Sequence, residues 1–242
     1  MKKILIATAV ATAFVAPHTF AQSAFEGFYG QIATGYENNT IQNTNLVVGP
    51  NSDGSHTGGT SSGGGTATSG SAPLIIGLGY TFSLAPQFTL GLGADYSTLS
   101  QTTNTATYNF GGGCADPDGG CGQVKYKISN RYNIFVTPGY AIDKDKLAYL
   151  KVGYSGVTAQ AQPQDGIANS VSTNLSGYVV GLGYKQIISG GFYGFGEANY
   201  YGYSKASFNG TSPNTDGTPP QPINLNPGVN AYNFLVGIGY KF

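Results

Sequence analysis

A two-residue alternation that recurs along the chain is the feature that most constrains its fold. In short segments, apolar or aromatic side chains occupy every second position, with Gly, Ser, Thr, Asn or a charged residue between them. This is the period of a β-strand, whose side chains point alternately to opposite faces. We expect eight strands, with apolar faces spanning Phe28–Tyr36, Leu74–Phe82, Phe88–Tyr96, Tyr132–Ile142, Ala148–Tyr154, Tyr178–Tyr184, Phe192–Tyr200 and Tyr232–Phe242.

The connections between these segments alternate in length. Short turns at 84–87, 143–146 and 188–191 follow the second, fourth and sixth strands. Long polar segments follow the first, third, fifth and seventh strands, which is typical of transmembrane barrels with short periplasmic turns and long extracellular loops. The predicted fold is an all-β, eight-stranded antiparallel transmembrane β-barrel with both chain ends in the periplasm. The predicted loops are Glu37–Ser71, Ser100–Gln123, Gly156–Ser170 and Lys205–Val229.

Strands of a soluble β-sandwich show the same alternation of side chains. Alternation alone therefore does not decide whether the apolar face points toward lipid or toward a protein core. Glycines stand opposite the bulky residues, as at Gly77, Gly79, Gly91 and Gly93, and small residues suit a narrow lumen. Aromatic residues recur eight positions apart. This interval rises about 20 Å at roughly 3.3 Å per residue and a tilt of roughly 40°, near the roughly 25 Å apolar band of such barrels. The predicted girdles contain Phe28, Tyr36, Phe88, Tyr96, Tyr132, Tyr140, Phe192 and Tyr200, and Tyr232 and Tyr240 repeat the interval.

Charged residues within the strands fall on the face opposite the apolar one, as expected if an ionised group facing lipid costs about 2–4 kcal/mol. We expect Glu197 and Asp95 to pair with Lys151 or Arg131 across the lumen. The alternative is that some of these charges lie in water at the strand ends. The predicted lumen charges are Asp95, Arg131, Lys151, Lys185 and Glu197.

Two strands fit the pattern less well. Pro138 cannot donate to the sheet ladder, so we expect a bulge in the fourth strand. In the seventh strand, Gly194 and Gly196 fall on the lipid side, whereas Tyr193 and Phe195 fall on the lumen side. The facing of the seventh strand is therefore left open.

The N-terminus has the features of a cleaved export signal. Lys2 and Lys3 precede an apolar stretch, and Thr19-Phe20-Ala21 ends in small residues suited to cleavage. A membrane-anchoring helix is the alternative, but the stretch is shorter than the roughly 20 residues that a spanning helix needs. We therefore expect a signal peptide at 1–21, a barrel domain at 22–242 and a location in the outer membrane.

Composition and isolated motifs argue against several other functions. Lys plus Arg and Asp plus Glu both number 11, and no basic stripe suggests a nucleic-acid partner. Cys114 and Cys121 flank a turn-forming stretch, and a disulfide is expected in an oxidising compartment. Metal binding by these two cysteines would need about two further ligands, and no histidine lies close to them in the sequence. Asp116-Pro117-Asp118-Gly119 resembles part of a calcium loop without the rest of the motif. No cofactor is expected.

An enzyme is a weaker hypothesis. Barrel hydrolases need a base beside a nucleophile, and the expected mature chain contains one histidine, His56, next to Ser55 in a Gly/Ser-rich segment. A solvated loop residue is the simpler interpretation. We therefore expect a protein that is not an enzyme, with a lipid-modifying barrel as a remote alternative.

The C-terminal residues resemble a known family. Tyr240-Lys241-Phe242 looks like the terminal strand that the barrel-assembly machinery recognises, and Gly-Leu-Gly-Tyr occurs at 77–80 and 181–184. Together these features are similar to the small porin-family barrels related to the OmpA membrane domain, OmpX and opacity proteins. The predicted assembly signal is Phe234, Val236, Ile238, Tyr240 and Phe242.

The resemblance implies partners and a function. The partners are outer-membrane lipid and lipopolysaccharide, periplasmic chaperones and the assembly machinery during export, and host or cell-surface ligands at the loops. It implies a structural scaffold that interacts, like an adhesin, through its extracellular loops. The alternative is a narrow porin or small-solute channel, although the lumen of eight strands is about wide enough for its own side chains.

Overall fold

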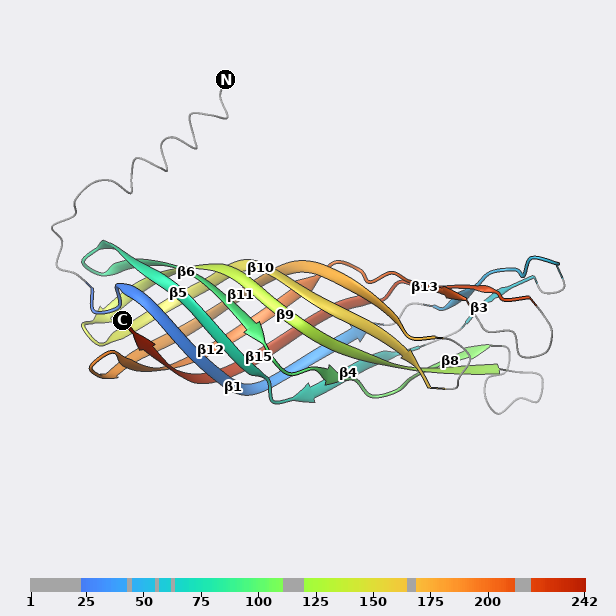
Figure 1. The fold of residues 1–242 in the computed structure, drawn as a ribbon, viewed down its shortest axis with the longest axis horizontal. Coiled ribbons are helices and arrows are strands. Elements are labelled where there is room, and N and C mark those ends of the chain that lie inside the picture. Colours follow the sequence, from blue (N-terminus) through green and yellow to red (C-terminus); the bar gives the residue numbers. More distant parts are fainter. Residues whose placement is uncertain are drawn as a thin grey trace, which may run out of the picture.

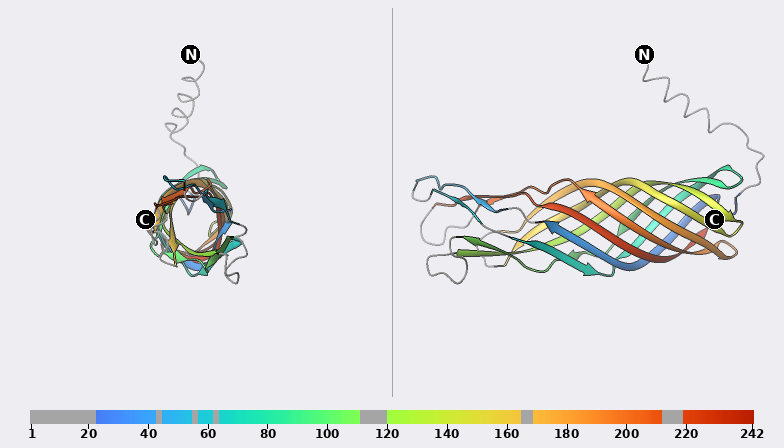
Figure 2. Two further views of the ribbon diagram at one scale, coloured as in Figure 1. Left: turned by 90° about the vertical axis from the view of Figure 1, so that its right-hand side faces the viewer. Right: turned by 180° about the vertical axis from the view of Figure 1, so that it is seen from behind.

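Eight long antiparallel strands form a closed ring. The computed structural model describes residues 23–42, 45–54, 57–61, 64–110, 120–164, 169–211 and 219–242. The ring runs in the order β1, β5, β6, β9, β10, β11, β12 and β15, and β15 pairs with β1 to close it (Figures 1 and 2). These strands are β1 (Gly27–Gln42), β5 (Leu74–Ala85), β6 (Phe88–Ser97), β9 (Gly120–Asp143), β10 (Lys146–Pro163), β11 (Val171–Ser189), β12 (Phe192–Tyr203) and β15 (Gly228–Lys241).

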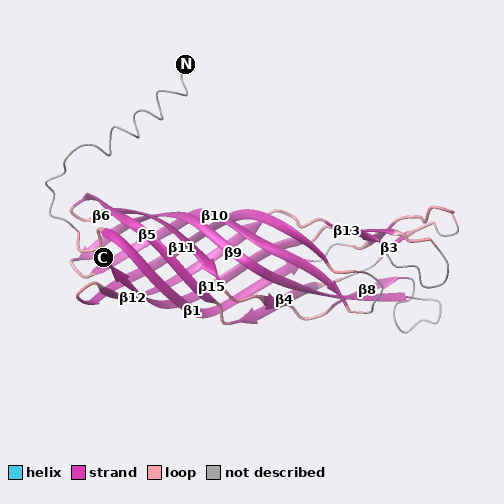
Figure 3. Ribbon diagram, viewed as in Figure 1, coloured by secondary structure: helices cyan, strands magenta, loops and turns pink. Residues whose placement is uncertain are grey.

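Seven short strands lie beyond one end of this ring, at the end opposite the three short turns (Figure 3). Three of them extend the barrel wall: β4 (Thr66–Ser71) pairs with β1, while β7 (Gln101–Thr102) and β8 (Ala106–Phe110) pair with β9. The other four form a separate small sheet in the order β13 (Phe208–Thr211), β14 (Pro222–Leu225), β2 (Val47–Val48) and β3 (Gly59–Thr60).

The predicted fold class is confirmed: the described chain is all-β and its eight-stranded ring is antiparallel. Among the described residues, no helix is long and apolar enough to cross a bilayer. The predicted signal peptide lies outside the described residues and stays a prediction. The first described residues and the C-terminus lie at the same end of the barrel, beside the short turns (Figure 1).

The bulky side chains of the alternating segments point outward. Leu78, Val236 and Leu182 are each more than 60% exposed, whereas Tyr193 and Phe195 of β12 are buried. The seventh strand therefore follows the common pattern, with its glycines toward lipid. The outward aromatic residues meet as neighbours in two belts. Ring contacts join Phe28 to Tyr80, Phe88 to Tyr140 and Phe192 to Tyr240 near the short turns, and Tyr36 to Tyr232, Tyr132 to Tyr154 and Tyr178 to Tyr200 at the far end.

Pro138 does not produce the expected bulge. It pairs with Leu90 of β6 in an unbroken ladder. On the other side, the pairing with β10 lapses opposite Leu150 and Lys151 and resumes in the same register. A missing N–H removes a ladder hydrogen bond without adding a residue to the strand, so the prediction of a bulge was wrong.

β9 has two irregularities against β10, one beside the hairpin at Lys146 and one further along the barrel. The register with β10 shifts between Gly156 and Thr158, opposite Asn130. Asn130 has a φ of 55°, in the left-handed region, and its side-chain oxygen accepts a hydrogen bond from the Tyr96 hydroxyl at 3.0 Å. An extra residue on one strand is a β-bulge. In a regular strand, residues an odd number of positions apart point to opposite faces. The bulge removes this constraint, so Arg131 and Ile128 both point inward.

The strands continue well beyond the predicted loop boundaries. The segments expected to be loops contain the outer third of β1 and much of β10, as well as β4, β7 and β8. We call the part of the chain beyond the belt at Tyr36 and Tyr132 the extracellular extension. In it the polarity of the two faces reverses: beyond the buried polar residues Glu37, Asn39 and Gln101 the lumen side becomes apolar, and the outer side becomes polar. This reversal is expected because water surrounds the wall beyond the membrane, which favours polar side chains on the outside and apolar side chains on the inside.

Candidate functional site

The lumen is filled in three layers, which we describe from the periplasmic end outward. The first layer surrounds Lys185 of β11, whose ammonium nitrogen lies 4.2 Å from the ring centre of Tyr29, 5.3 Å from that of Tyr149 and 5.1 Å from that of Tyr193. Such contacts stabilise a desolvated cation through the ring quadrupole. Phe25, just before β1, is buried in a cluster with Tyr149. We call this group the tyrosine layer.

The second layer contains a buried ion triad. Lys151 Nζ lies 2.8 Å from Asp95 Oδ2 and 2.9 Å from Glu197 Oε1, so one cation from β10 joins carboxylates from β6 and β12. Each carboxylate has a further donor, since the Asn133 amide donates to Asp95 and the Tyr149 hydroxyl donates to Glu197 at 2.8 Å. The Lys151 side chain is 1% exposed. This arrangement satisfies charges that would be costly if unpaired.

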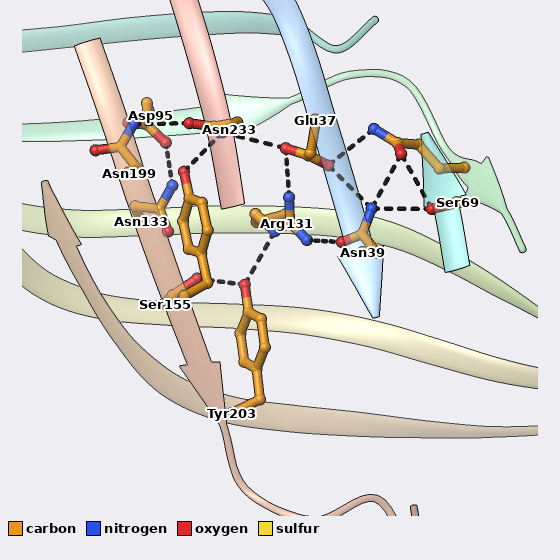
Figure 4. A network of polar contacts seen from close by, with 12 residues as sticks. Glu37, Asn39, Ser69, Asp95, Arg131, Asn133, Ser155, Asn199, Tyr203 and Asn233 are labelled. Atoms are coloured by element: carbon orange, nitrogen blue, oxygen red, sulfur yellow. Dashed lines mark hydrogen bonds and ion pairs between the residues drawn. The ribbon is translucent and has the colours of Figure 1, made fainter. Parts of the chain in front are cut away.

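A second ion pair lies beside the triad, nearer the extracellular end. Arg131 pairs with Glu37 of β1 and donates to Asn39, and its Nε donates to the Tyr203 hydroxyl at 2.9 Å (Figure 4). Glu37 also accepts from Gln101 Nε2 at 2.8 Å. Arg131 and Glu37 are both 3% exposed as side chains. We call the triad and this pair together the ionic layer.

All five predicted lumen charges lie on the inner face of the barrel. They form three separate groups. Asp95 and Glu197 share Lys151, whereas Arg131 pairs with a residue that was assigned to a loop, and Lys185 lies among aromatic rings. Glu37 was missed because the predicted strand ended at Tyr36. The signal was present in the sequence, since Glu37, Asn39 and Ile41 continue the alternation of β1.

The third layer is apolar and lies inside the extracellular extension. At its centre the hydroxyls of Tyr108 and Tyr126 are 2.8 Å apart, and the Tyr126 ring packs against Phe208. Burial raises the pKa of Tyr108 to about 12, partly offset by the hydrogen bond with Tyr126, and burial also raises the pKa of Tyr126. We call this group the outer apolar cluster. Its buried members are Ile41, Ala67, Ala106, Tyr108, Tyr126, Ile128, Val157, Ala159, Ala161, Leu175, Ala206, Phe208, Leu225 and Val229.

Four residues of the predicted assembly signal lie on the outward face of β15, and Phe242 directly follows the strand. Phe234, Ile238 and Phe242 are all strongly exposed, and recognition of the signal stays a prediction. Cys121 lies in β9, but Cys114 lies outside the described residues, so the disulfide stays a prediction too. His56 is also outside the described residues.

The periplasmic hairpin between β9 and β10 carries its own charges. Lys146 Nζ lies 2.8 Å from Asp143 Oδ2, and this hydrogen bond, together with the Asp145 backbone N–H, lowers the pKa of Asp143. Lys144 is 87% exposed and lies 3.8 Å from Asp145. These exposed pairs contribute little to stability.

The fold is that of an outer-membrane β-barrel. No family model matches the sequence, and no curated protein matches it. Among solved structures, OprG from Pseudomonas aeruginosa is similar with a TM-score of 0.51 at 13% identity, covering 90% of this chain and 97% of OprG. The outer-membrane protease OmpT from Escherichia coli is similar with a TM-score of 0.51 at 10% identity, covering 93% of this chain and 99% of OmpT.

A further solved structure, the attachment invasion locus protein Ail of Yersinia pestis, is 15% identical with a TM-score of 0.40, covering 90% of this chain and 99% of Ail. At identities this low, the similarity to OprG and OmpT shows the fold and not the function. The chain is accordingly a small outer-membrane β-barrel, and the outer membrane is where such a fold belongs.

Proposed function

We propose that this protein is a non-enzymatic scaffold of the outer membrane that makes contacts with surface ligands through its extracellular extension. The observation that carries the proposal is the extension itself, in which membrane strands continue into a β-structure with its own apolar interior. A loop that only closes a barrel needs no such core, because hairpins of a few residues suffice. The buried cluster holds the extension in one shape, which suits a surface that presents contacts.

The filled lumen supports a scaffold over a channel. The tyrosine layer, the ionic layer and the outer apolar cluster each place buried side chains across the interior. An eight-stranded barrel has little interior volume beyond its own side chains. The narrow porin considered from the sequence would therefore need several layers to rearrange.

The structure also shows how the extension should be trimmed to test the proposal. Removal of the whole predicted loop Glu37–Ser71 would delete Glu37 from the ionic layer and Ile41 and Ala67 from the outer apolar cluster. Replacement of 43–65 by Asn-Gly instead takes away β2 and β3 and joins Gln42 and Thr66, which face each other in the ladder, through a two-residue turn, so β4 stays paired with β1. The shorter deletion therefore tests contact by the extension without damaging the barrel.

The experiment compares attachment of cells that display the wild-type protein or the 43–65 deletion. Surfaces coated with glycans, matrix proteins or heparin serve as probes, and heat-modifiable migration on gels checks barrel folding. A matched control replaces the periplasmic hairpin residues Lys144 and Asp145 with Asn-Gly. We expect the deletion to reduce attachment at least tenfold and the control to leave it unchanged. Equal attachment by all three folded proteins would overturn the proposal.

A further inference from the structure

Lys185 differs from the other buried cations of the described lumen. Arg131 and Lys151 each contact a carboxylate directly. Lys185 is 8% exposed, yet among the described residues no carboxylate pairs with it and no acceptor takes a hydrogen bond from it. Lysines are rarely buried without a partner, because a desolvated charge is costly. The aromatic rings around Lys185 carry no net charge, so this cation lacks a counter-ion within contact distance.

A hollow at the periplasmic mouth of the barrel leads to Lys185. Its walls are mainly apolar and aromatic, with Phe25 and Leu147 among them, and its empty volume is about 280 Å³, the open mouth included. Pockets for drug-sized molecules hold roughly 300–1,000 Å³, so only a small group fits here. Lys241 also lines the hollow, and its ammonium group donates to the Ala24 carbonyl at 3.0 Å.

The walls of the hollow are fixed by contacts that involve no ligand. The Tyr193 hydroxyl donates to Gln31 Oε1 at 3.0 Å, and the Tyr149 hydroxyl donates to Glu197 Oε2 at 2.8 Å. Phe25 is buried in the same cluster as Tyr149. A ligand that enters such a site need not order its walls, which lowers the cost of binding.

The surroundings of Lys185 determine which charge a ligand can carry. Tyr149 lies between Lys185 and the ionic layer, because its ring faces the ammonium group while its hydroxyl bonds to Glu197. The ionic layer contains three carboxylates and two cations, and its negative excess balances Lys185 only at a distance. That excess repels a ligand with several negative charges. A single carboxylate matches the one ammonium group, and the apolar walls suit a short hydrocarbon body.

We propose that the hollow at Lys185 binds one carboxylate group with a short apolar body, presented from the periplasm, and that the Lys185 ammonium group is its counter-ion. Short-chain fatty acids carry such a group, and so does the C-terminus of a polypeptide that ends in an apolar residue. This inference concerns the periplasmic end of the barrel and does not depend on the proposed contacts of the extracellular extension.

Titration of butyrate into the folded full mature chain in phosphatidylcholine nanodiscs, followed by the NMR signals of the β11 backbone amides, tests the site. Lys185→Met keeps the length of the side chain and removes its charge. It should weaken butyrate binding about tenfold or more, since a charge-assisted contact is lost. Heat-modifiable migration checks that the variant folds. The matched control, Lys144→Met, removes an exposed lysine of the periplasmic hairpin and should bind butyrate like the wild type.

Further ligands test the wild-type protein without any substitution. Butyramide has the shape of butyrate without its charge, and it should bind about tenfold more weakly or not at all, as should inorganic phosphate at equal ionic strength. Equal binding of butyrate and butyramide would overturn the proposal, as would equal binding of butyrate by the wild type and Lys185→Met. Phosphate binding as tight as that of butyrate would reveal an unselective anion site and would equally overturn it.

A peptide distinguishes the two sources of the carboxylate. N-acetylated alanyl-leucine with a free C-terminus is compared with butyrate, and its C-terminal amide serves as the control. Tighter binding of the peptide acid would identify a chain end as the ligand, and tighter binding of butyrate would identify a free acid. Both results fit the proposed chemistry, whereas the absence of binding by either acid would contradict it.

Discussion

At the scale of single residues, Lys151 holds the barrel interior together. Its ammonium group contacts Asp95 and Glu197, which would otherwise be two carboxylates close to each other in a site shielded from water. It also lies 4.1 Å from the ring centre of Phe135. Removal of one partner from a buried ion pair costs far more than the pair contributes, since the remaining charge is left without compensation.

We therefore predict that Lys151→Met lowers the free energy of unfolding by about 3–5 kcal/mol. Unfolding by urea in lipid vesicles, monitored by heat-modifiable migration on gels, measures this change in free energy. Lys144→Met removes an exposed lysine of the periplasmic hairpin and should change the free energy by less than about 0.5 kcal/mol.

A rescue variant separates charge from packing. In Lys151→Met/Asp95→Asn/Glu197→Gln the three charges are removed together while the shapes are nearly kept. The hydrogen bonds from Asn133 and Tyr149 retain oxygen acceptors. This variant should regain part of the lost stability, because no buried charge is then left without compensation. A triple variant no more stable than Lys151→Met would show that the lysine acts by its shape.

The inward positions of the charged residues could be predicted from alternation, but their partners could not. Parity places Asp95, Lys151 and Glu197 on one face, whereas the register between strands decides which of them meet. Arg131 illustrates the limit. Its partner Glu37 lies on β1, but the predicted strand ended at Tyr36, six residues before the end of β1, so this carboxylate was assigned to a loop.

At the scale of strands, the membrane part of each element was predictable and the extension was not. Inside the bilayer the outer face is bulky and apolar, as at Leu150, Val152 and Tyr154 of β10. Beyond the tyrosine belt, the inner face carries Val157 and Ala159 instead. The apolar pattern therefore changes sides while the strand continues. A strand predicted from a single apolar face therefore ends at that change, although the two-residue alternation persists beyond it.

Asn130 of β9 provides a test of how the strand passes this boundary. Its left-handed backbone is unfavourable for residues with a branched Cβ and acceptable for Gly. We predict that Asn130→Val lowers the free energy of unfolding by about 1–2 kcal/mol. Asn130→Gly should lower it by less than about 0.5 kcal/mol, reflecting the lost hydrogen bond from the exposed Tyr96 hydroxyl. Equal effects of Val and Gly, measured in the same vesicles, would exclude backbone strain at the bulge.

At the scale of the whole molecule, the three layers act in series. The tyrosine layer lies at the periplasmic end, the ionic layer follows, and the outer apolar cluster closes the extracellular end. They rest on different interactions, namely aromatic contacts, ion pairs and apolar packing. A change that empties one layer leaves the other two in place, so the molecule as a whole should resist opening.

Planar-bilayer recordings can test this series arrangement. We predict that the wild-type protein gives no stable conductance steps, and that Tyr108→Ala/Tyr126→Ala, which opens the outer apolar cluster, is equally silent because the ionic layer still blocks the lumen. Tyr29→Ala/Tyr193→Ala at the periplasmic end should behave in the same way. Each variant is first checked for folding by its heat-modifiable migration. Steady conductance from either double variant would mean that one layer alone controls the lumen, and the protein would then be a gated channel whose remaining side chains leave a path for ions.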